Sequence, residues 1–213
     1  MTKPAEIRIG KLSVAHLPEI VTVHVQSFPQ SIITRLGPEA VRRYYEWQFI
    51  GPHQAHYLGA WVDGQVGGFC IGGKFRGAMG GFLSRNKWFL ARQVLLRPWL
   101  LASAEVRSAV VTALRRLLQP PSPVPHPSPP SPEQRHFGIL AIATAPPYRR
   151  LGLGARLMAE VEKLAREFRF AAMGLTVHPN NEPAICFYKR LGWSPVDTGG
   201  HWQGRMEKAL DEE

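Results

Sequence analysis

The chain of 213 residues contains little cysteine and no long apolar run. Its two cysteines, Cys70 and Cys186, lie far apart, which disfavours a disulfide-stabilised secreted fold and suits a reducing compartment. Arg97 and Pro98 interrupt the most apolar stretch, and the first residues lack the apolar region of a signal peptide. We therefore expect a cytoplasmic protein that does not span a membrane, with both thiols inert and packed inside apolar elements.

Acidic residues are also scarce, with 16 Asp and Glu against 26 Lys and Arg, so the net charge is +10. Most of the excess lies in residues 74–118, which contain nine Lys or Arg and only Glu105 as an acid. A basic balance favours anionic partners. No nucleic acid is expected, however, because the sequence shows no recognised nucleic-acid-binding motif beyond the charge itself.

A predicted strand and helix follow one another in the second half of the chain. Residues 137–144 are small and apolar, which is typical of a buried strand. From Leu153 to Phe168, apolar residues recur three and four positions apart, which predicts a helix with one buried stripe. The length and the 45% apolar content of the chain fit a single α/β domain over residues 1–213.

The turn between this strand and this helix has the sequence PPYRRLGLG, Pro146–Gly154. The first amide groups of a helix have no partner within it, so they can bind an oxyanion. Gly152 and Gly154 would let such a group approach, and Arg149 and Arg150 add positive charge. The segment therefore predicts an anion-binding site.

A second strand and helix are predicted further along the chain. Residues 171–177 favour a buried strand, and residues 178–183 supply turn and helix-start residues. A helix is expected from about Pro183 to Leu191, ended by Gly192, with a closing strand after it. The N-terminal half predicts a strand, two helices and a hairpin that turns at Asp63–Gly64. These elements are expected at residues 7–9, 15–25, from Pro38 onward, and at 56–62 and 65–72.

These segments resemble the GNAT superfamily of N-acetyltransferases, which pass the acetyl group of acetyl-coenzyme A to an amine. Residues 149–154 are similar to the family's R/QxxGxG/A motif. Its NxxAxxFYxxxGF pattern matches Asn181, Ala184, Phe187, Tyr188, Gly192 and Trp193, with Trp in place of the commoner Phe. The resemblance implies an α/β (α+β) fold with a mixed, largely antiparallel twisted sheet flanked by helices. Residues 74–119 would form a helical basic insertion, and residues 120–132 a Pro-rich connector.

The resemblance also implies the site, with acetyl-coenzyme A as co-substrate and no metal. Tyr188 would be the general acid that protonates the coenzyme A thiolate, although it could simply pack in the core. Asn181 would contact the pantetheine arm, although it could equally be a helix cap. The implied donor-binding residues are Ile142, Ala143, Thr144, Arg149, Arg150, Leu151, Gly152, Leu153, Gly154, Ala155, Asn181 and Tyr188.

The general base is not identified by the sequence. Residues 137–144 contain no Asp or Glu that could face the substrate, which leaves His136, His178 and Glu182 as candidates. Ordinary turn roles are favoured for the last two. A base linked through solvent would also serve many amines.

The expected reaction is direct attack by the amine of a small molecule or peptide in a ternary complex, because no Cys or Ser is placed to form an acyl-enzyme. Two alternatives stay open: a catalytically silent coenzyme A-binding module, and an acyltransferase that uses a longer acyl thioester. By family analogy the loop of residues 27–36, with Thr34 and Arg35, lines the acceptor entrance.

The insertion carries more large apolar side chains than a solvated helix would, so we expect them to be covered. Three interpretations stay open: packing on the core or against a second copy in a homodimer, a lid over the acceptor site, and contact with an anionic membrane surface. Residues 120–132, with eight prolines, predict an extended spacer. The apolar residues concerned are Phe82, Leu83, Trp88, Phe89, Leu90, Leu95, Leu96, Trp99 and Leu100.

Overall fold

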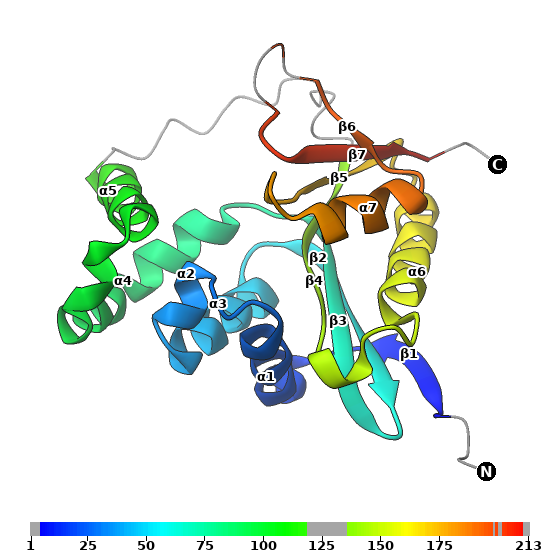
Figure 1. Ribbon diagram of the computed structural model, residues 1–213, viewed down its shortest axis with the longest axis horizontal. Coiled ribbons are helices and arrows are strands. Elements are labelled where there is room, and N and C mark those ends of the chain that lie inside the picture. The colour runs from blue at the N-terminus through cyan, green and yellow to red at the C-terminus, as the bar shows by residue number, and fades with distance from the viewer. Residues whose placement is uncertain (1–4, 119–135, 198, 200–201, 211–213) are drawn as a thin grey trace. The chain divides into compact units, whose positions relative to one another are not determined.

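The computed structural model describes residues 5–118, 136–197, 199 and 202–210 (Figure 1). The Pro-rich connector expected at residues 120–132 lies outside them. The described residues cluster into two compact units. The sheet unit contains residues up to 12, residues 54–74 and the chain from 136 onward, and the helical unit contains residues 13–53 and those from 75. A single domain over residues 1–213 stays a prediction.

The sheet unit is built on a mixed sheet with seven strands in the described part of the chain. Every neighbouring pair is antiparallel except β4 and β5, which are parallel. The prediction of a mixed, largely antiparallel sheet is therefore confirmed. The strands in spatial order are β1 (Ile7–Lys11), β2 (Gln54–Val62), β3 (Gln65–Lys74), β4 (His136–Thr144), β5 (Ala172–Thr176), β7 (Arg205–Ala209) and β6 (Ser194–Pro195).

The β2–β3 hairpin turns where the sequence predicts it. Asp63 and Gly64 both have positive φ, 48° and 82°, as the tightest hairpin turns require. Cys70 on β3 is buried, as predicted, whereas Cys186 is exposed, so the prediction that it packs inside an apolar element is wrong. The second thiol lies on the outer side of a short amphipathic helix.

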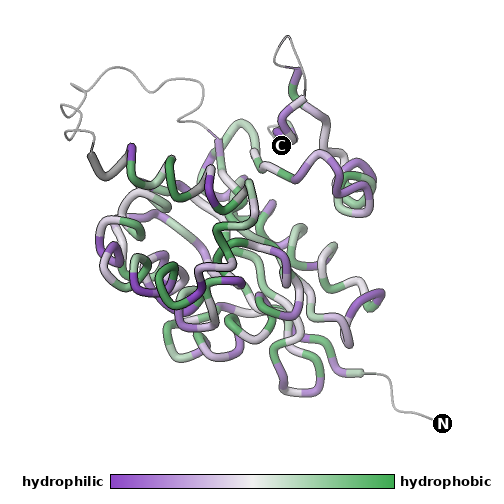
Figure 2. Tube along the Cα trace, turned by 60° about the vertical axis from the view of Figure 1, so that its left-hand side comes forward, coloured by the Kyte–Doolittle hydropathy of each residue, from purple (hydrophilic) through white to green (hydrophobic). Residues whose placement is uncertain are grey.

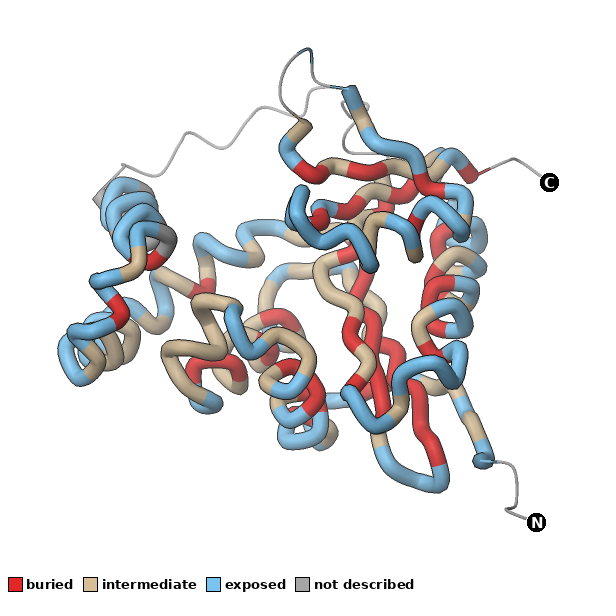
Figure 3. The backbone as a smooth tube through the Cα atoms, viewed as in Figure 1, coloured by how far each residue is buried: buried red, intermediate tan, exposed pale blue. Residues whose placement is uncertain are grey.

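Helix α6 (Leu153–Glu167) supplies one side of the core of the sheet unit. Its buried stripe contains Leu157, Val161 and Ala165, which pack with Phe137 and Met173 of the sheet. Strands and inner helix turns are the buried parts of the trace (Figure 3), and hydrophobic and hydrophilic residues alternate along the helices (Figure 2). The unit also contains η4 (Pro146–Tyr148) and α7 (Glu182–Arg190).

The sequence pattern extends the buried stripe of α6 to Phe168, and this is wrong. Phe168 is the residue after the last helical turn, and its side chain is 56% exposed. The centroid of its ring lies 4.7 Å from that of the His56 ring. The helical period no longer directs a side chain inward once the helix has ended.

The helical unit contains the two predicted N-terminal helices and the predicted insertion. The loop expected at residues 27–37 includes a short helix, because the Ser31 hydroxyl accepts a hydrogen bond from the Thr34 amide at 3.2 Å. No helix in the described part of the chain is long and apolar enough to cross a membrane. The elements are η1 (Val14–His16), α1 (Leu17–Ser27), α2 (Ile32–Arg35), α3 (Pro38–Ile50), α4 (Ala78–Leu96), η2 (Pro98–Ala102) and α5 (Ala104–Leu118).

Helix α4 of the insertion packs on α3. The Phe82 ring meets Tyr44 edge to face with centroids 5.4 Å apart, and the Arg43 guanidinium lies 4.3 Å from the centre of the Phe89 ring. A side chain at position 81 would clash with the Trp47 ring, so the glycine lets the two helices approach closely. The expectation that the apolar residues of the insertion are covered therefore holds for Phe82 and Leu100. It is wrong for four others, each more than half exposed: Trp88, Leu95, Leu96 and Trp99.

A buried polar cluster links α1, α2 and α3 in the helical unit. His24 Nδ1 lies 2.8 Å from the Tyr45 hydroxyl, and His24 Nε2 lies 3.3 Å from Ser31 Oγ. Removal from water disfavours the imidazolium, so burial lowers the pKa of His24 to about 4. His24 is therefore neutral in the folded protein at neutral pH.

Acid should destabilise the protein through His24. An unfolded histidine gains a proton near pH 6.5, whereas folded His24 does not until about pH 4. The unfolded state binds more protons between these values, so the free energy of unfolding should fall by up to about 3 kcal/mol as the pH falls through this window. Urea unfolding of the wild type and of His24→Gln at a series of pH values checks this. An equally steep decline in both proteins would contradict it.

Candidate functional site

The sheet opens between β4 and β5. These strands pair only at the start of β4, where Gly138 lies beside Gly174. Beyond that point β4 continues along β3, and β5 continues along β7. Within the described residues, no strand pairs with residues 139–143 on the β5 side, so that edge of β4 presents backbone groups to a ligand.

The direction of these backbone groups follows from one hydrogen bond. The Ala145 amide donates to the Gly67 carbonyl at 2.9 Å and therefore points toward β3. Because successive amides of a strand point to opposite sides, the Ala143 amide also points toward β3, and those of Ile142 and Thr144 point toward β5. The Thr144 carbonyl accepts a hydrogen bond from Arg149 Nε at 3.4 Å.

The turn after β4 is fixed to the end of the β2–β3 hairpin. The Tyr148 ring lies over Gly67, where an added Cβ would be 2.9 Å from the ring, and its hydroxyl donates to Gln65 Oε1 at 3.1 Å. No local motif of the sequence marks Gln65 or Gly67 as supports of the site. The adjacent glycines in β3 could have indicated the close approach of another segment.

The backbone from Arg149 to the start of α6 takes an unusual path. Arg150 and Gly152 both lie in the left-handed region, with φ of 67° and 75°. For a residue such as Arg150 this conformation costs about 1–2 kcal/mol, and such strain is typical of functional loops. A Cβ added at Gly152 would have no protein atom within 4 Å, so the space before it is open.

The N-terminus of α6 has donors without acceptors. Its cap residue is Gly152, which has no side chain to accept a hydrogen bond, and its first turn contains no acidic residue. The first backbone bond of the helix is donated by Arg156 to the Gly152 carbonyl at 3.1 Å. No acceptor for the amides of residues 153–155 is found among the described residues. The helix dipole adds positive potential at the same place.

Gly154 brings the two sequence motifs together. A Cβ at this position would lie 3.2 Å from Cζ of Phe187, so the glycine lets the Phe187 ring of α7 pack on the first turn of α6. A glycine is therefore needed at position 154 for the packing of α7 on α6, whereas the sequence pattern predicts that it lets a ligand approach. Asn181 caps α7 by accepting a hydrogen bond from the Ala184 amide at 3.3 Å, and a contact with the pantetheine arm stays a prediction.

The Tyr188 side chain is 8% exposed and its ring packs against Phe187 and Trp193. Its hydroxyl has no hydrogen-bond partner among the described residues, and it is not one of their fully enclosed unpaired polar atoms. Burial raises the pKa of Tyr188 to about 12, with a smaller electrostatic contribution from the Cys70 thiol. Tyr188 is thus protonated at neutral pH and its proton is free to be donated.

The candidate bases have other roles in the structure. His136 Nδ1 lies 3.5 Å from Glu207 Oε1, at the opposite end of β4 from Thr144, about 25 Å away along an extended strand. The Nδ1 of His178 accepts a hydrogen bond from the Asn180 amide at 3.2 Å, as a turn residue would. Glu182 is exposed in the first turn of α7.

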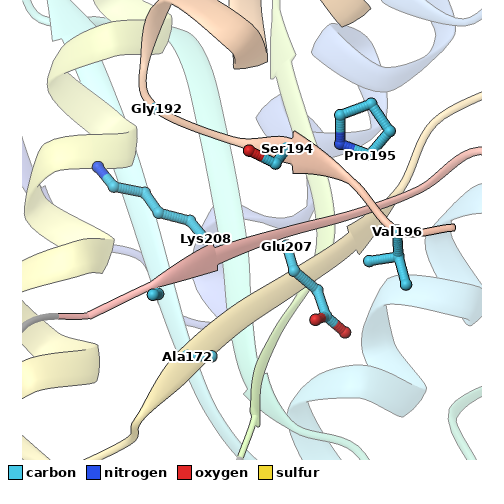
Figure 4. Close-up of a pocket in the computed structure, with 8 residues that line it drawn as sticks. Ala172, Gly192, Ser194, Pro195, Val196, Glu207 and Lys208 are labelled. Carbon is cyan, nitrogen blue, oxygen red and sulfur yellow. The ribbon is translucent and has the colours of Figure 1, made fainter.

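A shallow hollow lies at the far edge of the sheet, beside β6 and β7 (Figure 4). Glu207 and Lys208 line it and point to opposite sides of the sheet. Both charges are already paired, Glu207 with Arg205 at 2.7 Å and Lys208 with Glu162 at 2.7 Å. The hollow contains none of the predicted donor residues. No group of three or more His, Cys, Asp or Glu among the described residues could hold a metal ion.

Comparison with known proteins gives two kinds of match in sequence. Residues 111–193 match the model of the acetyltransferase (GNAT) family. The probable N-acetyltransferase san of Drosophila melanogaster is 36% identical over 77 residues, which are 36% of this chain and 42% of that protein. N-alpha-acetyltransferase 50 of Danio rerio is 31% identical over 80 residues, 37% of this chain and 48% of that protein. The chain thus aligns with less than half the length of these curated relatives.

Solved structures share the fold over almost the whole chain. The PaiA N-acetyltransferase from Thermoplasma acidophilum, determined with coenzyme A, has a TM-score of 0.58 at 16% identity and covers 96% of this chain and 99% of its own. The ribosomal-protein-S18-alanine N-acetyltransferase from Escherichia coli has a TM-score of 0.57 at 14% identity, with 98% and 96% covered. Residues 111–193 thus match an acetyltransferase (GNAT) domain, and almost the whole chain shares the fold of solved N-acetyltransferases.

Proposed function

We propose that the chain transfers the acetyl group of acetyl-coenzyme A to a primary amine by direct attack in a ternary complex. The observation that carries the proposal is that the uncapped amides of α6 and the unpaired edge of β4 are joined by a single short turn. Amides at a helix start suit the pyrophosphate of coenzyme A. An unpaired strand edge suits the two amide groups of its pantetheine arm, which can pair with it as a further strand would.

The proposed contacts with acetyl-coenzyme A form two groups, one at the start of α6 and one along the edge of β4. The amides of residues 151–155 and the exposed guanidinium groups of Arg149 and Arg150 bind the pyrophosphate. Ile142 and Thr144 offer backbone groups to the pantetheine arm and the thioester. Ala143 supports them through its pairing with Phe69 of β3. Asn181 contributes from the cap of α7.

The proposed reaction needs one bond formed and one broken. The lone pair of the amine attacks the thioester carbonyl, and an amide of β4 stabilises the oxyanion that develops. The carbon–sulfur bond then breaks, and the thiolate takes the proton of Tyr188. The ammonium proton passes to solvent or to a base, and Tyr188 is reprotonated from solvent.

The surroundings of Tyr188 support its role as acid. A tyrosine with a pKa of about 12 is a weak acid, and it would not protonate a fully solvated thiolate. The same burial, however, also raises the pKa of the neighbouring Cys70 thiol far above its usual value. A leaving thiolate in this apolar environment would be correspondingly basic, so transfer of the tyrosine proton becomes feasible.

The acceptor class is proposed from the names of relatives. One curated relative is named an N-alpha-acetyltransferase, and one structural neighbour is named for an alanine of a ribosomal protein. Peptides with free α-amino groups are therefore the first acceptors to test, followed by small amines. Thr34 and Arg35 stay predicted at the acceptor entrance.

The proposal is tested by measuring binding and turnover separately. Calorimetry should show acetyl-coenzyme A binding, and a thiol reagent should show coenzyme A release with at least one amine of the panel. Binding without release on any amine would favour a silent coenzyme A module. Greater thermal stabilisation by a long-chain acyl thioester than by acetyl-coenzyme A would favour the longer donor.

Replacement of Gly152 should weaken donor binding. Gly152→Val places a side chain in the open space before α6, so the dissociation constant for acetyl-coenzyme A should rise about tenfold or more. Gly64→Val is the matched control, because Gly64 also has positive φ and open space around it. Both variants carry similar backbone strain, and only Gly152 borders the proposed phosphate site. Equal donor affinity in the two variants would reject the assignment.

Replacement of Tyr188 should separate catalysis from binding. Tyr188→Phe keeps the ring and removes the proton, so kcat should fall about a hundredfold while the dissociation constant of acetyl-coenzyme A stays unchanged. Tyr57→Phe, at another half-buried tyrosine of the sheet unit, is the control. Because the pKa of Tyr188 is raised from 10.0 to about 12, wild-type kcat should not decline near pH 10. Normal kcat in Tyr188→Phe would remove it from the acid role.

A further inference from the structure

The outward side of α4 and η2 has no part in the proposed reaction. The buried side of α4 contacts α3 through Phe82 and Phe89. A different side of α4 carries Trp88 and Leu95, which lie two helical turns apart and are each 79% exposed. Leu96, the last residue of α4, is 56% exposed, and Trp99 of the following η2 is 65% exposed. These four residues, Trp88, Leu95, Leu96 and Trp99, are called the tryptophan face.

Single exposed apolar residues are normal on a protein surface, but this group is not. Two indole rings and two leucines follow one another within a short stretch of one segment. The outer turns of α4 and η2 are exposed along this stretch (Figure 3). Leaving so much apolar surface in water is unfavourable, which points to a binding surface.

Cationic side chains flank the tryptophan face. Lys87 and Arg92 lie in the same turns of α4, and Lys87 Nζ is 5.6 Å from the centre of the Trp88 ring. Arg85, one turn earlier, lies instead over the Trp47 ring of α3 at 5.4 Å. None of the three forms an ion pair with a carboxylate of the described residues. Residues 74–118 contain nine Lys or Arg and only Glu105 as an acid. Among the described side chains, the face therefore combines apolar rings with the positive charges of Lys87 and Arg92, for which no carboxylate partner is found.

We propose that the tryptophan face binds the surface of an anionic lipid bilayer, with α4 lying in the plane of the headgroups. Indole and leucine side chains would enter the boundary between headgroups and acyl chains, where Trp is favoured. The arginine and lysine side chains are long enough to reach lipid phosphates from the same helix. This surface activity is separate from the proposed acetyl transfer and does not depend on it.

Charge argues against a second copy of the chain as the occupant. A symmetric dimer through this face would bring the same residues of both copies together. Lys87 and Arg92 would then lie close to their equivalents, and like charges at an interface are unfavourable. An anionic lipid surface supplies the opposite charge, and fluid lipids also adapt to the shape of the two indoles.

The test is co-sedimentation of the full chain with vesicles of phosphatidylcholine alone or mixed with phosphatidylserine. We expect binding to the mixed vesicles, weakened by added salt, and little binding to phosphatidylcholine alone. Trp88→Ser combined with Trp99→Ser should reduce partitioning about tenfold or more. Lys87→Gln combined with Arg92→Gln should reduce it by a similar factor and flatten the salt dependence.

Ile50→Ser is the matched control, because Ile50 is 58% exposed on α3 and should not affect binding. Thermal unfolding of each variant checks that the fold is retained, as expected for substitutions at exposed positions. Failure of the wild type to bind mixed vesicles, or equal binding to both vesicle types, would overturn the proposal. So would a dimer that Trp88→Ser with Trp99→Ser dissociates, because the face would then be occupied by a second copy.

Discussion

The separation of β4 from β5 is the constraint on which the candidate site depends. Two strands that stay paired satisfy each other's backbone groups and leave nothing for a ligand. Here the pairing ends at Gly138 and Gly174, and each strand continues along a different neighbour. The edge of β4 is therefore unpaired within an otherwise continuous sheet, where it can be used without exposing the outer edges of the sheet.

Other features of the sheet unit keep this edge open and connect it to the helix. The turn after β4 is fixed to the β2–β3 hairpin by the Ala145 amide and the Tyr148 hydroxyl. That attachment determines where α6 begins, and the buried stripe of α6 holds the helix against the sheet. Donor groups of the strand edge and of the helix start are consequently positioned by regular elements, which makes the proposed donor site rigid before any ligand binds.

Much of the fold could be predicted from local sequence signals. The stripe with Leu157 and Val161 predicts α6, and the Asp63–Gly64 pair predicts the hairpin, because helical period and turn residues act over a few positions. The separation of β4 from β5 could not be predicted, since backbone pairing leaves no mark on side chains. The exposure of Phe168 and Trp88 could not be predicted either, because it depends on which element, if any, packs against their side chains.

The candidate site also contains residues that the sequence identifies and residues that only the structure identifies. Gly152 and the arginines before it could be identified from their pattern, whereas the supporting roles of Gln65 and Gly67 arise from contacts across the sheet. Asn181 and Tyr188 could be placed by resemblance, but the capping bond of one and the burial of the other needed coordinates. Local sequence patterns thus predict which residues belong to the site. The contacts and burial of each residue, which determine its role, depend on long-range packing.

The contact between Gly154 and Phe187 has a consequence for how such a protein can change. Under the proposed mechanism it fixes the leaving-group acid on α7 relative to the phosphate-binding turn of α6, helix against helix. Loops elsewhere in the chain do not take part in that spacing. Acceptor preference can therefore diverge through loop substitutions while the machinery that releases coenzyme A stays intact, and the two properties are free to evolve independently.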